Sequence, residues 1–447
     1  MPAQRKARPL TSDGASHIDP GNVLVDFPGP ASGHVLLVSA ECQLAELRRA
    51  PLRDVRHTAH AETTMKTLHD HPALHGLPAI WLRDNCPCRE CRDSHSGQRL
   101  LSITDLPAEV AVDAVTVSGD AVEIVFSPDG HRSVFDVGWL AQFGALRATR
   151  ASGAPDDRTE ATKWLWTAAG IAGDLPEGSW PRYLRDCAHR EECLRALLVD
   201  GFVLLRDVPC EPGTVLTVAG TMGFVRETNY GRLFDVRVEA TPDNLAFTGL
   251  AIGPHTDNPY RDPVPTVQLL HCLTGAVRGG DSGLVDGFLA AKLLRAEDPA
   301  AFDLLARTPV TFAYADGTAA LQATRPMIGV DPLGRIREIR FNARSLQPVR
   351  LPAGEITAFY AAYRTFAEMI SRPELMLTFR LSPGDCVIFD NTRVLHARTA
   401  FAATGRRHLQ GCYADLDGVA STWAVLRRES SDYRNHDGGQ GYERLTS

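Results

Sequence analysis

GLAIGPHTDNPYRDP, residues 249–263, carries His255 and Asp257 two positions apart. Residues two apart on an extended strand point to the same side, so this imidazole and this carboxylate can face one metal ion. A second stretch, FDNTRVLHARTAF at residues 389–401, offers His396 directly after a buried strand. Two imidazoles and one carboxylate leave three positions of an octahedral ion open, as in oxygen-activating non-haem Fe(II) sites. An H-x-D pair alone is a weak signal, because 15 histidines give chance matches.

Two further polar residues strengthen this interpretation. Arg407 lies 11 residues after His396 on the next expected strand, from which it can clamp the far carboxylate of a chelating α-keto acid. Ser282, in the segment GGDS at residues 279–282, can donate a second hydrogen bond. The alternative for Arg407 is an ion pair at the surface.

The sequence around these residues predicts a fold of many short strands braced by few helices. Apolar residues at positions 356, 359, 363, 366 and 370 form the stripe of a helix packed on one face of a sheet. Further helices are expected at Arg182–Val199 and Pro212–Met222. The expected strands are Gly201–Val208, Val267–Leu273, Gly283–Val285, Arg337–Phe341, Met376–Leu381, Cys386–Phe389 and His408–Ala414. This pattern favours a β-sandwich or barrel over a doubly wound parallel sheet.

Closer to the N-terminus, three cysteines lie within six residues, in Cys86-Pro-Cys88-Arg-Glu-Cys91. They follow an expected strand at Pro78–Arg83. Thiolates aimed from a tight turn favour a tetrahedral Zn²⁺. The spacing leaves open whether His95 or His131 is the fourth ligand, and unligated or redox-active cysteines are the alternative.

A small β-rich unit surrounds these cysteines. Strands are expected at His34–Ser39, Val115–Val117 and Val122–Phe126, the last two joined by a Ser-Gly-Asp hairpin turn. A helix is expected at Phe135–Phe143, and residues 150–178 read as a linker.

Composition excludes several classes of protein. The 447 residues are 44% apolar and carry a net charge of −7, so a nucleic acid or another polyanion is not an expected partner. No apolar run approaches the roughly 18 residues that a membrane-spanning helix needs. Ten cysteines are too sparse for a disulfide scaffold, and the first residues lack the apolar core of a secretory signal. We therefore expect a cytoplasmic protein.

Several blocks resemble the Fe(II)- and 2-oxoglutarate-dependent dioxygenases of the γ-butyrobetaine and trimethyllysine type. They are WLRDNCPCRECRDS, NLAFTGLAIGPHTDNPY, VQLLHCL, GGDSGLVDGF, LSPGDCVIFDNTRVLHART and RHLQGCYADLD, in the order of that family, between about Leu77 and Arg427. The resemblance implies a mainly β fold with bracing helices: a double-stranded β-helix, or jelly-roll, at 179–430 after a zinc-binding β-rich domain at 34–149. A mobile extension at 1–33, a linker at 150–178 and a tail at 431–447 complete the expected domain organisation.

The resemblance also implies roles for single residues. It places Fe(II) on His255, Asp257 and His396, and 2-oxoglutarate on Arg407 with help from Ser282. It places Zn(II) on Cys86, Cys88, Cys91 and His131, in preference to His95. Because Asp257 is present, hydroxylation with O₂ is expected rather than halogenation. Stimulation by ascorbate and a homodimer are expected from the family by analogy.

For the substrate, the resemblance implies a small trimethylammonium compound held by aromatic faces. The cage positions match Tyr230, Phe234, Phe247 and Tyr413, whereas Asn258 stands at a position that is usually aromatic. Asn258 and Arg344, with Arg261 nearby, can donate to an acidic group larger than a carboxylate. From the resemblance we expect a γ-butyrobetaine-like substrate, whereas these donors favour the phosphonate alternative. The alternatives are 2-(trimethylammonio)ethylphosphonate, a natural-product intermediate, and a non-catalytic metal-binding jelly-roll protein.

Overall fold

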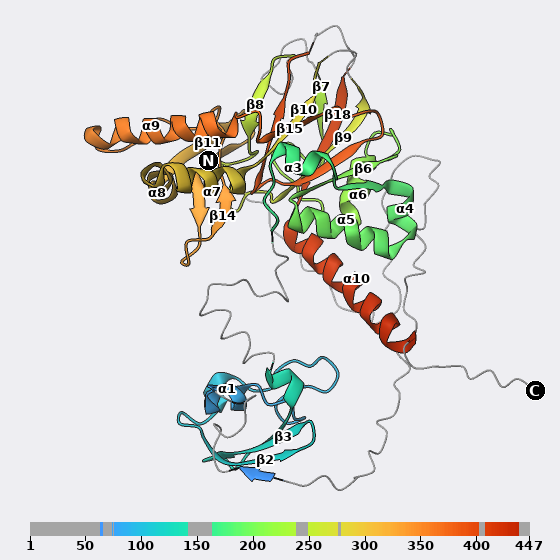
Figure 1. The fold of residues 1–447 in the computed structure, drawn as a ribbon, viewed down its shortest axis with the longest axis vertical. Helices are drawn as coiled ribbons and strands as arrows, with labels where there is room; N and C mark the ends of the chain where they lie inside the picture. The colour runs from blue at the N-terminus through green and yellow to red at the C-terminus, as the bar shows by residue number, and fades with distance from the viewer. Residues whose placement is uncertain are drawn as a thin grey trace, which may run out of the picture. The chain divides into compact units, whose positions relative to one another are not determined.

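The computed structural model describes residues 63–65, 74, 76–141, 163–237, 249–275, 279–401 and 407–437. These residues form an N-terminal unit, up to residue 141, and a core at 163–437 (Figure 1). The expected extension at 1–33 and the expected strand at His34–Ser39 lie outside the described residues. The expected tail begins inside a helix, because helix α10 runs from Leu416 to Asp437.

Two sheets form the core, as the jelly-roll prediction requires. The larger sheet has the strand order β5-β6-β16-β9-β18-β7 and the smaller one β15-β10-β17-β8. The strands are β5 Glu177–Ser179, β6 Phe202–Arg206, β7 Phe234–Arg237, β8 Ile252–His255, β9 Val267–Thr274, β10 Ser282–Asp286, β15 Met376–Phe379, β16 Cys386–Asp390, β17 Val394–Arg398 and β18 His408–Ala414. All the strands expected in these sheets are present, with ends shifted by a few residues.

Strand β16 shows why these sequences read as continuous apolar runs. Its residues Cys386–Asp390 are all buried. Val387 and Phe389 belong to the apolar cluster between the two sheets, and Cys386 and Ile388 to the cluster under the outer helices. Successive side chains of a strand point to opposite faces, so a strand covered on both faces has no polar side.

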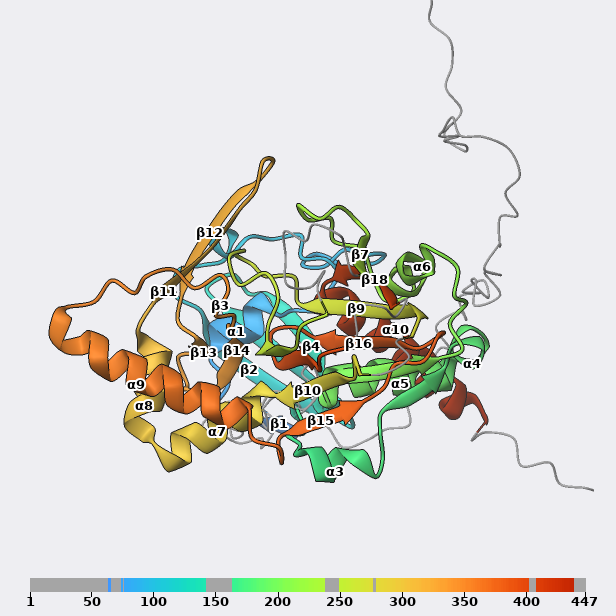
Figure 2. The same ribbon diagram turned by 90° about the horizontal axis from the view of Figure 1, so that it is seen from above.

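Helices cover the sheets in two groups (Figures 1 and 2). Helices α4 (Trp180–Arg185), α5 (Cys187–Val199), α6 (Thr214–Gly220) and α10 pack on the outer face of the larger sheet. The chain between β10 and β15 forms helices α7 (Gly287–Glu297), α8 (Pro299–Arg307) and α9 (Ala353–Ile370), with hairpins β11–β12 (Val310–Ala315 and Ala320–Arg325) and β13–β14 (Ile328–Val330 and Ile336–Ile339). Helix α9 confirms the predicted helix, but its apolar stripe packs mainly on helices α7 and α8 and not on a sheet. Within the described part of the chain, no helix is long and apolar enough to cross a membrane.

The C-terminal part of the expected linker is not a linker. Residues 163–178 pack onto the core, where helix α3 spans Ala168–Ala172 and strand β5 pairs in parallel with β6. Trp166 is buried and donates from its indole nitrogen to the carbonyl of Asp200. In the described part of this segment, Gly173, Asp174 and Pro176 lie in the short connection between α3 and β5.

The N-terminal unit contains a four-stranded sheet of β1 (Thr63–Met65), β2 (Ala111–Ser118), β3 (Ala121–Ser127) and β4 (Arg132–Asp136). Gly119 has φ of 57° in the β2–β3 turn, which confirms the predicted hairpin. The expected strand at Pro78–Arg83 is wrong, because this run forms helix α1 (Ala79–Asp84) with Leu82 buried. A short apolar run does not distinguish the two, and stacking of Trp81 on Trp139 favours the helix. The expected helix at Phe135–Phe143 begins later, since Phe135 belongs to β4.

Candidate active site

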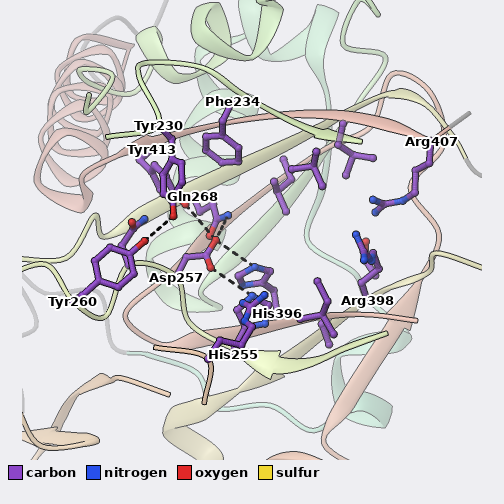
Figure 3. Close-up of a pocket in the computed structure, with 18 residues that line it drawn as sticks. Tyr230, Phe234, His255, Asp257, Tyr260, Gln268, His396, Arg398, Arg407 and Tyr413 are labelled. Atoms are coloured by element: carbon purple, nitrogen blue, oxygen red, sulfur yellow. Dashed lines mark hydrogen bonds and ion pairs between the residues drawn. The ribbon is translucent and has the colours of Figure 1, made fainter. Parts of the chain in front are cut away.

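A cavity of about 880 Å³, including its open mouth, lies between the two sheets (Figure 3). Its walls come from strands β7, β9 and β18 of the larger sheet and β8, β10 and β17 of the smaller one. The cavity brings together nearly all the predicted iron, co-substrate and substrate residues. They are Tyr230, Phe234, His255, Asp257, Asn258, Ser282, Arg344, His396, Arg407 and Tyr413. Phe247 lies outside the described residues.

Strand register places the two histidines face to face. His255 on β8 is the direct partner of His396 on β17, and their ring centroids are 4.1 Å apart. Asp257 follows two residues after the end of β8. Its Oδ1 lies 3.4 Å from Nε2 of His255, and its Oδ2 lies 3.7 Å from Nε2 of His396. The three side chains therefore converge as the H-x-D spacing predicted, with their donor atoms within 4.8 Å of one another.

Hydrogen bonds fix how these side chains point. Nδ1 of His255 lies 2.9 Å from the carbonyl oxygen of Gly253. A proton on Nδ1 leaves the lone pair on Nε2, which faces Asp257. The amide of Asn391 pairs with the backbone of Asp257 in both directions, accepting from its N–H and donating to its carbonyl, each at 2.9 Å.

Burial sets the protonation of the group. It lowers the pKa of His396 to about 3, with a further contribution from His255, so this imidazole is neutral at neutral pH. Burial alone would raise the pKa of Asp257, but His396, His255 and Arg344 outweigh it and hold the pKa well below its usual value. A carboxylate and an imidazole lone pair are thus available, and this oxygen and nitrogen donor set fits Fe(II).

Arginines gather at the far end of the cavity. Arg407 is 7% exposed and directly precedes β18. Its guanidinium and that of Arg398 lie 5.4 Å and 5.0 Å from the ring centroid of Phe401. Ser282 on β10 is the strand partner of Arg398. The cluster can bind a carboxylate.

Sequence reasoning missed Arg398, although a signal existed. It lies two residues after His396 on the same strand and therefore points to the same side. Burial and the charges of Arg407 and Arg344 lower the pKa of Arg398 to about 10, which leaves it protonated at neutral pH. It donates to the carbonyl of Leu250 at 2.8 Å.

Aromatic rings line the opposite end. The centroid of Phe234 is 6.3 Å from that of Tyr230 and 5.1 Å from that of Tyr413. Tyr260, which sequence reasoning missed, has its hydroxyl 2.9 Å from that of Tyr230 and its ring stacked on Tyr314 at 5.1 Å. Tyr260 could have been found from its place in the HTDNPY segment. Tyr314 comes from hairpin β11–β12, whose position the sequence did not reveal.

Two further side chains that can donate hydrogen bonds, Asn258 and Arg344, line the same cavity. Asn258 has a left-handed backbone with φ of 56° and is 2% exposed. Among the described residues, neither atom of its side-chain amide makes a hydrogen bond of good geometry. Arg344 also lines the cavity. Arg261 does not, because it donates to Asn229 at 2.6 Å, which corrects the expectation that it lies among the pocket donors.

The predicted cysteine cluster also comes together in the N-terminal unit. Nε2 of His131 lies 3.2 Å, 3.6 Å and 3.5 Å from the sulfurs of Cys86, Cys88 and Cys91. His95 is not part of this group. Burial raises the pKa of Cys86 to about 12, so this sulfur needs a cation to remain a thiolate. Arg83 supplies one positive charge nearby, donating to Cys91 at 3.3 Å and to Asp129 at 2.9 Å.

Comparison with known proteins shows the family to which the chain belongs. The model of the family described as "Taurine catabolism dioxygenase TauD, TfdA family" matches residues 169–413, more than half of the chain. The chain belongs to this family. The model described as "Gamma-butyrobetaine hydroxylase-like, N-terminal" matches residues 57–141, which include the cysteine cluster.

Curated relatives agree with the resemblance seen in the sequence. The chain is 39% identical to gamma-butyrobetaine dioxygenase of Pseudomonas sp. (strain AK-1), over 78% of this chain and 90% of that protein. It is 33% identical to the human gamma-butyrobetaine dioxygenase, over 78% and 91% of the two chains. It is 31% identical to trimethyllysine dioxygenase of Meyerozyma guilliermondii, over 78% and 89%.

Family membership confirms the predicted fold and the predicted class of enzyme. The protein is a 2-oxoglutarate-dependent dioxygenase that uses iron and acts on a small molecule. The matched interval 169–413 contains both histidines, Asp257 and Arg407.

Proposed function

We propose that the protein hydroxylates a small trimethylammonium compound of the γ-butyrobetaine type. In this proposal, His255, Asp257 and His396 hold Fe(II), and Arg407 with Ser282 binds the far carboxylate of 2-oxoglutarate. One observation carries the proposal: the same cavity contains an aromatic end, the His/Asp group and an arginine end, in that order. The similarity to gamma-butyrobetaine dioxygenases supports it.

Each part of the cavity has a chemical task. A quaternary ammonium has no N–H to donate, so the faces of Tyr230, Phe234 and Tyr413 hold it by cation–π attraction, about 0.5 to 2 kcal/mol per favourable ring. Fe(II) with 2-oxoglutarate supplies O₂ activation coupled to decarboxylation to succinate. The protein orients the target carbon next to the His/Asp group. The apolar side chains of Val236, Ile252, Leu270 and Leu409 line the rest of the cavity and limit water.

A second substrate, 2-(trimethylammonio)ethylphosphonate, is favoured by one specific observation. Among the described residues, the buried amide of Asn258 makes no hydrogen bond of good geometry, and it lines the same cavity as Arg344. A phosphonate carries one more oxygen than a carboxylate and makes several charge-assisted hydrogen bonds. Asn258 and Arg344 can supply these bonds.

A substrate panel tests both candidates. We expect more succinate with γ-butyrobetaine or the phosphonate than with trimethyllysine. Trimethyllysine has a longer chain, and the proposed site offers no acceptor for its α-amino group. The variant Asn258→Gly removes the amide but keeps the left-handed backbone, which glycine adopts freely. If the phosphonate is the substrate, this variant raises its KM more than that of γ-butyrobetaine. The proposal is refuted if none of the three compounds stimulates succinate formation.

We propose further that Cys86, Cys88, Cys91 and His131 bind one structural Zn(II). Three thiolates and one imidazole form a closed tetrahedral shell with no position for a substrate. The pair Arg83–Asp129 supports this site, because Asp129 also accepts from the backbone N–H of His131 at 3.2 Å. The homodimer and the stimulation by ascorbate stay predictions.

The zinc proposal predicts the outcome of one substitution. Cys91→Ser is expected to lower the zinc content from about one ion per chain to near zero, because a serine hydroxyl is a poor ligand for this metal. The matched control is Cys210→Ser, since Cys210 is exposed and lies outside the cluster. Elemental analysis of the purified full chain measures both. Equal zinc contents in the two variants would contradict the assignment.

A further inference from the structure

The carboxylate of Asp257 is held on one oxygen by two side chains that neither the sequence nor the family comparison assigned to this task. Oδ2 accepts from Nε2 of Gln268 at 2.9 Å and from the hydroxyl of Tyr413 at 3.2 Å (Figure 3). Within the described part of the chain, Oδ1 accepts from neither an amide nor a hydroxyl group. Each oxygen also lies near one imidazole, Oδ1 at 3.4 Å from Nε2 of His255 and Oδ2 at 3.7 Å from Nε2 of His396. The two oxygens of this carboxylate therefore have different surroundings.

The sheets fix this arrangement. Gln268 on β9 and Tyr413 on β18 are direct strand partners in the larger sheet, whereas Asp257 extends from β8 of the smaller sheet. Gln268 and Tyr413 are 1% and 3% exposed, so water does not compete well for these hydrogen bonds. A carboxylate only accepts, so the Gln268 amide must present its NH₂ group. Bonds to a charged acceptor in such a setting are stronger than neutral ones.

Each carboxylate oxygen has about two lone-pair sites. Two donors occupy those of Oδ2, and Oδ1 remains available. We propose that Gln268 and Tyr413 are positioning residues that hold Oδ2 and present Oδ1 alone to the metal, so that Asp257 takes one coordination position. This inference rests on the proposed role of Asp257 as an iron ligand.

The arrangement has a consequence for the co-substrate. A carboxylate that bound through both oxygens would take a second of the six positions of an octahedral ion. A single bound oxygen keeps three positions open for 2-oxoglutarate and O₂. Loss of the two donors is therefore expected to weaken the binding of the metal and then of 2-oxoglutarate to the metal-loaded protein.

The test uses Gln268→Met and Tyr413→Phe in the full chain with its zinc retained. The probe is Mn²⁺, which binds oxygen and nitrogen ligands and disfavours thiolates. We expect each variant to bind Mn²⁺ about 10- to 100-fold more weakly than the wild type, as is typical when a partner of a metal ligand is lost. The affinity of the Mn²⁺-loaded protein for 2-oxoglutarate, measured by calorimetry without O₂, should also fall.

Two matched controls separate this effect from general loss of stability. Gln410→Met removes a glutamine of β18 that bonds to Asp235 and Gly213 instead. Tyr230→Phe removes a hydroxyl that bonds to Tyr260 and not to Asp257. Both controls should bind Mn²⁺ like the wild type. Melting temperatures of the metal-free variants report any damage to the fold.

Clear outcomes would overturn the inference. It fails if Gln268→Met and Tyr413→Phe both bind Mn²⁺ within about twofold of the wild type, or if the controls lose as much affinity. It also fails if His255→Ala binds Mn²⁺ like the wild type, because the metal is then elsewhere. Absence of turnover with every trimethylammonium substrate would refute the proposed function alone, since the Mn²⁺ measurement needs no substrate.

Discussion

Replacing His255 with alanine is expected to reduce iron-dependent decarboxylation of 2-oxoglutarate to the background of the assay. The variant removes one of three ligands and leaves only His396 and Asp257 to hold the ion. Loss of a single outer partner of a metal site already costs about 10- to 100-fold, and loss of a ligand should cost more. Succinate formation and the iron content of the purified protein measure the effect.

The matched control is His95→Ala. His95 is exposed and lies outside both groups of potential metal ligands. We expect this variant to keep both activity and iron. If His255→Ala retained activity, the assignment of the iron site would be wrong. If His95→Ala lost zinc, the choice of His131 as fourth zinc ligand would be wrong.

The sequence predicted the His/Asp group because its geometry follows from local rules. His255 and Asp257 were predicted to share a side from their spacing of two, and they do converge although β8 ends at His255. His396 was predicted from the buried run that precedes it. The pairing of β8 with β17 then places the two histidines opposite each other. These residues could be proposed without knowing how the strands pair. The pairing of the strands is what brings them together in the folded chain.

The contact of Gln268 with Asp257 depends on strand order, which the sequence does not show. Gln268 acts next to Tyr413 because β9 lies beside β18 in register, although 145 positions separate the two residues. Tyr314 stacks on Tyr260 from hairpin β11–β12, which the chain inserts between β10 and β15. Helix α1 was misread for another reason, since six residues are too few to distinguish a period of two from 3.6.

Residues 163–166, which the sequence suggested to be part of a linker, contact a buried ion pair between Arg393 and Asp286. Arg393 donates to the carbonyls of Val199 and Trp164 and forms an ion pair with Asp286 at 2.9 Å. Both charged side chains are 0% exposed. Asp286 also accepts from the backbone N–H of Trp166 at 3.1 Å. The pair thus joins residues 163–166, the end of β10 and the start of β17, and these two strands carry Ser282 and His396.

The variant Asp286→Asn is therefore expected to lower the free energy of unfolding of the core by about 3 to 5 kcal/mol, because it leaves a buried guanidinium uncompensated. Asp286 also caps helix α7 by accepting from Phe288 and Leu289. Asparagine caps helices equally well, so the substitution isolates the loss of charge. Denaturant titration of the full chain, followed by tryptophan fluorescence, measures the change.

Helix α7 also supplies the control. Glu297 at its C-terminal end pairs with Arg372 at 2.7 Å, and both side chains are largely exposed. Exposed pairs contribute little to stability, so Glu297→Gln should cost far less than Asp286→Asn. Equal losses of unfolding free energy in the two variants would show that the buried ion pair stabilises the fold no more than the exposed pair does. A larger loss for Asp286→Asn, accompanied by weaker Mn²⁺ binding, would show that this ion pair holds β10 and β17 where His396 can meet His255.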